Sequence, residues 1–229
     1  MSAVTQLREN TDLSNFIHEQ YLGDPELLQR YERFVGWQLE YMLPFYDDLR
    51  SSPDRAAAVD FVVSDLTGIS ISERDQEVAK VLPIMSRMLP ASALGAVATA
   101  MQLNARVLTT NLSICRALFA EISIDADITE ASYCAACRRA SDLDECLALV
   151  HLTADIGRNL EHVIRIPLMG LTLRAMRMPA RLAGFGVLQL FLENGYKTFN
   201  ALQDVDQFLD DMTVRMTEVF GRIFTEPNS

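Results

Sequence analysis

The stretch 90–122 constrains the fold most, because only three of its residues, Arg106, Arg116 and Glu121, carry charge. Apolar residues recur in it at three- and four-residue steps, which is the period of an α-helix. A helix that is apolar on nearly every side must be covered by other helices, since exposing it would leave a large apolar area in water. The sequence therefore predicts an all-α protein around a buried central helix at about residues 92–122.

The remainder of the chain predicts further amphipathic helices, separated by proline, glycine and short polar connections. The pattern indicates about nine helices in all and contains no alternation typical of a strand. A length of 229 residues, 49% of them hydrophobic, suits one domain with a large core. We expect a single-domain multi-helix bundle over 1–229, with disordered ends at 1–10 and 225–229.

Charge and composition exclude several classes of protein. A net charge of −11 makes the surface repel phosphate backbones, so we expect no nucleic-acid partner. The first ten residues lack the apolar segment of a secretory signal. The four cysteines do not form the pattern of a disulfide framework. The longest uncharged run, 91–105, is shorter than the roughly twenty residues of a membrane span. We expect a cytoplasmic protein without a membrane span.

Neutral polar residues interrupt the central helix. Gln102, Asn104 and Asn111 are three of them, and burial would oblige each to find a hydrogen-bond partner. They either line a ligand-binding cavity or bond to backbone and neighbouring helices. We name all three as candidate ligand-binding residues and leave both explanations open.

Three arginines follow one another at helical spacing near residue 180. Arg174, Arg177 and Arg181 stand out in a chain with only two lysines and an acidic excess. Flanked by methionine and leucine, they are candidates to clamp a carboxylate or phosphate beside an apolar tunnel, provided that the helix continues through Pro179. The alternative is that they pair with acidic residues of neighbouring helices.

The histidines suggest a weaker, metal-binding alternative. His151, Asp155 and His162 share one side of a predicted helix with Arg158, and ligands four residues apart can project together. This side lies opposite the predicted apolar stripe of that helix, whose central members are Leu149, Leu152, Ile156, Leu160 and Val163 and whose margin is widened by Val150, Gly157 and Ile164. A solvated, salt-bridged surface is therefore the competing interpretation, and we assign no metal site.

Two local patterns have structural explanations. Cys134 and Cys137 are spaced as in redox and zinc motifs, but no preceding strand or further ligand pair accompanies them, so helix packing explains them better. Asp75 follows a serine by three residues, which matches a capping box at a helix start.

Two sets of motifs stand out along the chain. The first comprises 61–66 with Gly68, then Arg74-Asp75, Leu82-Pro83 and Leu89-Pro90; the second runs from Ile156-Gly157-Arg158 through Leu173-Arg174 and Met176-Arg177 to Phe191-Leu192-Glu193. In these motifs, which span most of 61–199, the chain resembles an uncharacterised bacterial family known only as a domain of unknown function. The resemblance implies a soluble helical domain and carries no activity.

Two hypotheses for function follow. The leading one is a non-catalytic binding or regulatory protein for a protein partner or a small anionic or acyl ligand, acting as a homodimer. An aromatic cluster at Trp37, Tyr41, Phe45 and Tyr46 is typical of a core or dimer contact. The alternative is a helical-bundle enzyme that uses a metal or haem through His151, Asp155, Glu161 or His162. No cofactor is specified by the sequence.

Overall fold

The computed structural model describes residues 2–65, 71–88, 91–165 and 167–225, which form helices and connections without a strand among them. The α-helices are α1 (Ala3–Leu22), α2 (Pro25–Met42), α3 (Pro53–Asp60), α4 (Ile71–Met88), α5 (Ala91–Phe119), α6 (Glu130–Ala140), α7 (Leu143–Ile164), α8 (Met169–Leu182), α9 (Gly186–Ala201) and α10 (Val205–Thr225). A 3₁₀ segment, η1 (Leu43–Arg50), and a π-helical turn, η2 (Phe61–Asp65), join them. The predicted all-α class is confirmed, with ten described α-helices where about nine were predicted.

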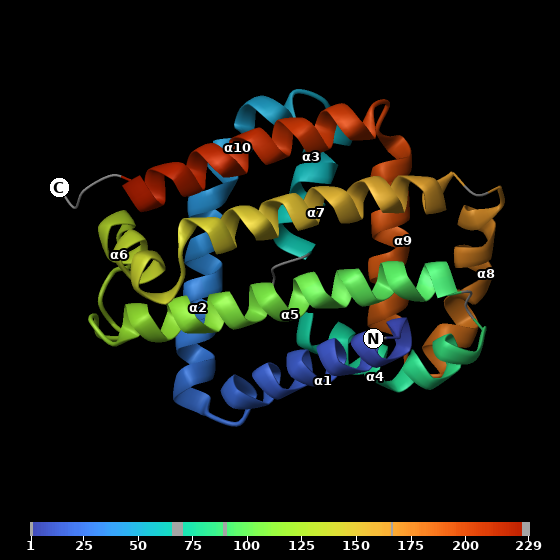
Figure 1. Ribbon diagram of the computed structural model, residues 1–229, viewed down its shortest axis with the longest axis horizontal. Helices are drawn as coiled ribbons and strands as arrows, with labels where there is room; N and C mark the ends of the chain where they lie inside the picture. The colour runs from blue at the N-terminus through green and yellow to red at the C-terminus, as the bar shows by residue number, and fades with distance from the viewer. Residues whose placement is uncertain (1, 66–70, 89–90, 166, 226–229) are drawn as a thin grey trace.

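The helices form two crossed layers. In Figure 1, α1, α5, α7 and α10 run side by side along the long axis, and α2, α3 and α9 cross behind them. Helix α6 closes one end of the long axis and α8 lies at the other. Neighbouring helices in the front layer are in contact in the order α1, α5, α7 and α10, so α5 has a long helix on each side.

Helix α5 is the buried central helix that the sequence predicts. Its buried side chains extend from Leu94 to Phe119, and among residues 94–119 only Thr109 and Arg116 are exposed. Two apolar clusters meet along it: Leu94, Ala98 and Met101 belong to a small cluster with α1 and α4, and Leu108 onward belongs to the main core. One helix therefore connects both parts of the core.

The aromatic cluster of α2 and η1 contributes to the main core. Tyr46 is fully buried, and Trp37 and Tyr41 lie stacked with ring centroids 5.0 Å apart. Both rings pack against Tyr133 of α6, which is also buried. Their packing within the chain explains the aromatic content of this segment.

Helix α7 buries a face shifted from the centre of the predicted stripe toward its margin. Its buried positions are Cys146, Val150, Ala154 and Gly157; Val150 and Gly157 were predicted at the margin of the stripe, whereas Leu160, from its centre, is exposed. Close packing against α10 accompanies this shift. A Cβ atom on Gly157 would lie 2.8 Å from the methyl carbons of Leu209, so a larger residue there would displace the Leu209 side chain.

The ends of the chain and its membrane topology were also predicted. Residues 3–10, where we expected disorder, form the first turns of α1, and the Ser2 hydroxyl accepts a hydrogen bond from the Thr5 amide as an N-cap. Residues 226–229 lie outside the described residues. None of the described helices combines the length and apolarity that a membrane crossing requires.

Candidate functional site

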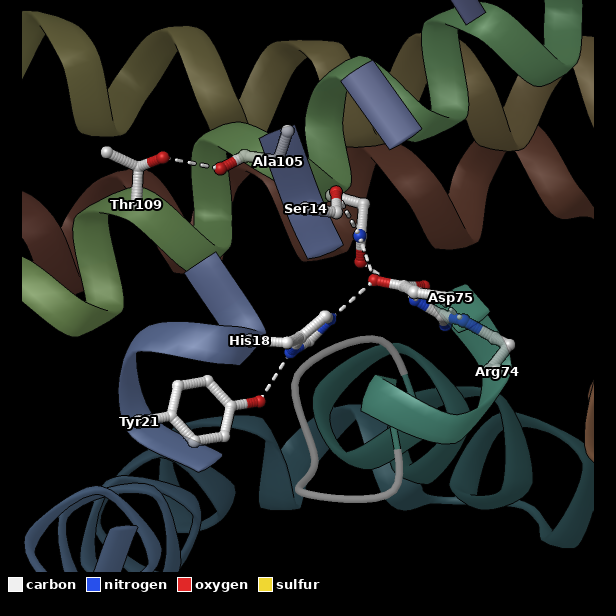
Figure 2. Close-up of polar contacts among 8 residues, drawn as sticks. Ser14, His18, Tyr21, Arg74, Asp75, Ala105 and Thr109 are labelled. Carbon is white, nitrogen blue, oxygen red and sulfur yellow. Dashed lines mark hydrogen bonds and ion pairs between the residues drawn. The ribbon is translucent and has the colours of Figure 1, made fainter. Parts of the chain in front are cut away.

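A buried polar network joins α1, α4 and α5. His18 lies at its centre, with Nε2 2.8 Å from the Asp75 carboxylate and Nδ1 in contact with the Tyr21 hydroxyl (Figure 2). Because a carboxylate only accepts hydrogen bonds, His18 donates from Nε2, while its Nδ1 shares a second hydrogen bond with the Tyr21 hydroxyl. All three side chains are at least 98% buried. The chain of contacts runs carboxylate, imidazole, phenol.

Arg74 and Asn104 complete the network. The Arg74 guanidinium donates to Oδ1 of Asp75 at 3.1 Å and to Oδ1 of Asn104 at 2.8 Å, and it also lies 4.6 Å from the centre of the Phe191 ring. The Asn104 amide donates to Oδ2 of Asp75 at 2.6 Å and to the Ser14 hydroxyl at 3.1 Å. The charge of the Asp75 carboxylate is thus balanced by Arg74. The carboxylate accepts hydrogen bonds from three side chains, those of His18, Arg74 and Asn104.

The network fits a structural connection between helices better than a reaction centre. Burial, with a contribution from Asp75, raises the pKa of the Tyr21 hydroxyl above its usual range, so the phenol stays protonated. The ring of Tyr21 also stacks on Tyr31, with centroids 4.4 Å apart. A satisfied buried network of this kind stabilises one relative arrangement of its helices.

The other two polar candidates on α5 also bond to neighbouring helices. Gln102 accepts a hydrogen bond from Gln6 of α1 at 3.4 Å, and Asn111, which is buried, bonds to Tyr31 of α2. Like Asn104, they form hydrogen bonds to neighbouring helices, which is one of the two explanations that the sequence left open. Their role in ligand binding stays a prediction.

The three arginines of α8 line up as the sequence requires. Helix α8 continues through Pro179 to Leu182, so Arg174 and Arg181 lie two turns apart on one side. Arg177 pairs with Glu193 of α9, donating from Nε to its carboxylate at 2.7 Å, and this contact lowers the pKa of Glu193 to about 2. In the part of the chain that the structure describes, neither Arg174 nor Arg181 forms an ion pair.

Helix α8 contacts the rest of the protein mainly through α9. Gly170 lies against the Tyr196 ring, and the backbone carbonyl of Leu173 accepts from Gln189 at 2.7 Å. The opposite side carries a row of exposed residues at helical spacing, which we call the α8 stripe: Leu171, Ala175, Met178 and Leu182. The leucines and Met178 are 60% to 83% exposed, and Ala180 is the buried residue of this helix. The apolar side is a surface and not the predicted tunnel.

Arg174 and Arg181 lie along one edge of the α8 stripe. Each follows a member of the stripe by three residues, so each is displaced from it by about one-sixth of a turn. Leu168, just before the helix, is also exposed and has a φ of 67°, a conformation that leucine seldom adopts. An apolar surface flanked by arginines results.

The candidate metal residues lie on the outside of α7. His151 and Asp155 are exposed, and the side chain of His162 lies outside the described residues. Arg158 pairs with Asp155 at 3.2 Å and with Asp210 of α10 at 2.6 Å, as a salt-bridged surface would. No group of three or more potential metal ligands occurs among the described side chains.

The four cysteines are free thiols on helices, and three of them, Cys115, Cys137 and Cys146, are buried. Cys137 lies in the second half of α6, away from its N-terminus, where Thr129 is the cap. Burial raises the pKa of Cys115 and of Cys137 to about 12, so the thiolate that reacts with electrophiles is about a thousandfold scarcer than for a free thiol. Cys134 is the least buried of the four.

We therefore expect iodoacetamide at pH 8 to modify Cys134 first and to leave Cys115 and Cys137 unmodified while the protein is folded. Peptide mass spectrometry after a short pulse measures this, and the same pulse in denaturant gives the fully modified control. Rapid modification of native Cys137 would show that α6 opens readily or that its thiol is activated.

A sequence model of one protein family, described as a domain of unknown function (DUF8198), matches residues 18–229. The chain belongs to this family. The matched region contains the two sets of motifs on which the resemblance was based, together with all of α8. No curated protein and no solved structure shows a significant match.

Within the DUF8198 region lie His18, Arg74, Asp75 and Asn104 of the buried network; Ser14 precedes it. Sequence reasoning placed only Asn104 among the candidate site residues. Arg74 and Asp75 belong to one of the motifs that the chain shares with the family. The spacing of Asp75 from a preceding serine predicted a capping box and not a buried network. The α8 stripe is detectable in the sequence as apolar residues at three- and four-residue steps between the arginines.

Proposed function

We propose that this DUF8198 chain is a non-catalytic recognition protein that binds an anionic partner with an apolar body at the outer side of α8. The carrying observation is that α8 leaves Leu171, Met178 and Leu182 in solvent beside two arginines without ion pairs among the described residues. An exposed apolar surface with adjacent cations is typical of a binding site for such a partner.

Two further features support the proposal. The sequence predicts Asp60, Asp65 and Asp75 as alternative partners for these arginines. Asp60 bonds to Arg50 and Asp75 bonds within the buried network, and the side chain of Asp65 lies outside the described residues. In addition, methionine side chains adapt to differently shaped apolar groups, which suits a recognition surface. A homodimer, as the sequence suggested, would add to this function without being required by it.

An anionic aromatic probe tests the proposal. We expect 8-anilinonaphthalene-1-sulfonate to gain fluorescence with the native protein and the double variant Leu171→Ser, Leu182→Ser to lose most of that gain. The variant removes two exposed side chains, so circular dichroism should show an unchanged helix content.

The matched control is the double variant Leu13→Ser, Phe16→Ser, which removes two exposed apolar side chains from α1. It should keep the fluorescence gain of the native protein. Equal losses in both double variants, or no gain with the native protein, would contradict binding at α8.

A further inference from the structure

The charge of α8 is opposite to that of the protein as a whole. The helix carries Arg174, Arg177 and Arg181 without an acidic residue, in a chain whose net charge is −11. Glu193 of α9 is paired with Arg177, and the charge of Arg174 also helps to lower the pKa of this carboxyl. Charge complementarity therefore favours an anionic occupant for this surface.

The size of the surface limits what that occupant can be. Stable protein interfaces use roughly 20–30 residues on each side. Ten of the 14 residues of this helix are exposed, which is fewer than such an interface uses, and its outward side presents the α8 stripe and the two edge arginines. A second copy docked on the same face would also bring the three arginines of each α8 together. A lipid surface needs only a buried apolar face and flanking cations.

The geometry of α8 is that of a helix that lies in a membrane interface. Its apolar side faces away from α9, and Arg174 and Arg181 flank that side, where long cationic side chains reach lipid headgroups while their stems stay apolar. In Figure 1, α8 lies at one end of the long axis, so the acidic body extends away from it. Repulsion of charges farther from the lipid than a Debye length of about 8 Å is screened at physiological salt.

We infer that α8 docks this protein onto an anionic phospholipid surface, with the α8 stripe in the headgroup and acyl boundary and Arg174 and Arg181 on lipid phosphates. This inference rests on the proposed function and names its partner. The rest of the chain remains outside the membrane.

Co-sedimentation of the full chain with vesicles tests the inference. We expect binding to vesicles of phosphatidylcholine and phosphatidylglycerol, little binding to phosphatidylcholine alone, and weaker binding as salt rises. The double variant Arg174→Gln, Arg181→Gln should weaken binding about thirtyfold, since each arginine near an anionic surface contributes about fivefold.

The matched control is Arg50→Gln, Arg139→Gln. It makes the same change in net charge by removing two surface ion pairs outside α8, and it should bind as the native protein does. Equal weakening in the two variants, or equal binding to neutral and anionic vesicles, would overturn the inference.

The two proposals can fail separately. Probe fluorescence that depends on the α8 stripe, without any vesicle binding, would overturn the lipid surface and leave the recognition site in place. A native dimer that the Leu171→Ser, Leu182→Ser variant converts to a monomer would likewise replace the lipid by a second copy. Absence of both the probe signal and the vesicle binding with the native protein would overturn both proposals.

Discussion

Replacing Leu112 by aspartate is expected to lower the free energy of unfolding by about 3–5 kcal/mol. Leu112 is 97% buried in the main core on α5, between the helices that cover it. A carboxylate that replaces this side chain must be buried among apolar residues at high cost or force the core to open. Chemical denaturation followed by circular dichroism measures the loss.

The control for this substitution lies on the same helix. Thr109, one turn earlier, is exposed and its hydroxyl donates to the carbonyl of Ala105 within the same helix, so Thr109→Asp should change the stability by less than about 1 kcal/mol. Similar stabilities for Leu112→Asp and the native protein would refute a buried central helix.

Replacing Asp75 by alanine should lower the free energy of unfolding by about 3–5 kcal/mol, for a different reason. Asp75 is fully buried and balances Arg74, which would keep its charge after the substitution and lose that partner. His18 and Asn104 would each lose an acceptor at the same time. Removing one partner of a buried ion pair is far more destabilising than replacing both partners by apolar residues, because the remaining charge stays buried without compensation.

An exposed carboxylate gives the comparison. Asp155 pairs with Arg158 on the surface of α7, so Asp155→Ala should cost no more than about 1 kcal/mol. Equal effects of the two aspartate substitutions in a thermal melt would mean that the network contributes no more than a surface ion pair.

The sequence predicts the fold well where apolar residues are dense and less well where packing is set by small residues. The scarcity of charge in 90–122 sufficed to identify α5 as central. On α7 the large residues Leu149, Leu152 and Ile156 were predicted at the centre of the buried stripe but are only half-buried, because the small residues Ala154 and Gly157 allow α10 to approach more closely. A hydrophobic period ranks side chains by apolarity, whereas close helix packing selects them by size.

Of the candidate sites, the α8 arginines were predictable and the buried network was not. Spacing along one helix is contained in the sequence, so Arg174 and Arg181 could be placed on a common side once the helix continued through Pro179. His18, Asp75 and Asn104 come from three helices, and their meeting depends on how α1, α4 and α5 pack. No local pattern encodes that distance.

The most direct test of recognition at α8 is a methyl spectrum of the full chain with ¹³C-labelled methionine, titrated with 8-anilinonaphthalene-1-sulfonate. Of the ten methionines, Met176 and Met178 lie exposed on α8, whereas Met101 and Met212 are buried in the core. If the probe binds at α8, the signals of Met176 and Met178 should move while those of Met101 and Met212 stay in place. Shifts confined to methionines outside α8, with Met178 unchanged, would contradict recognition at α8.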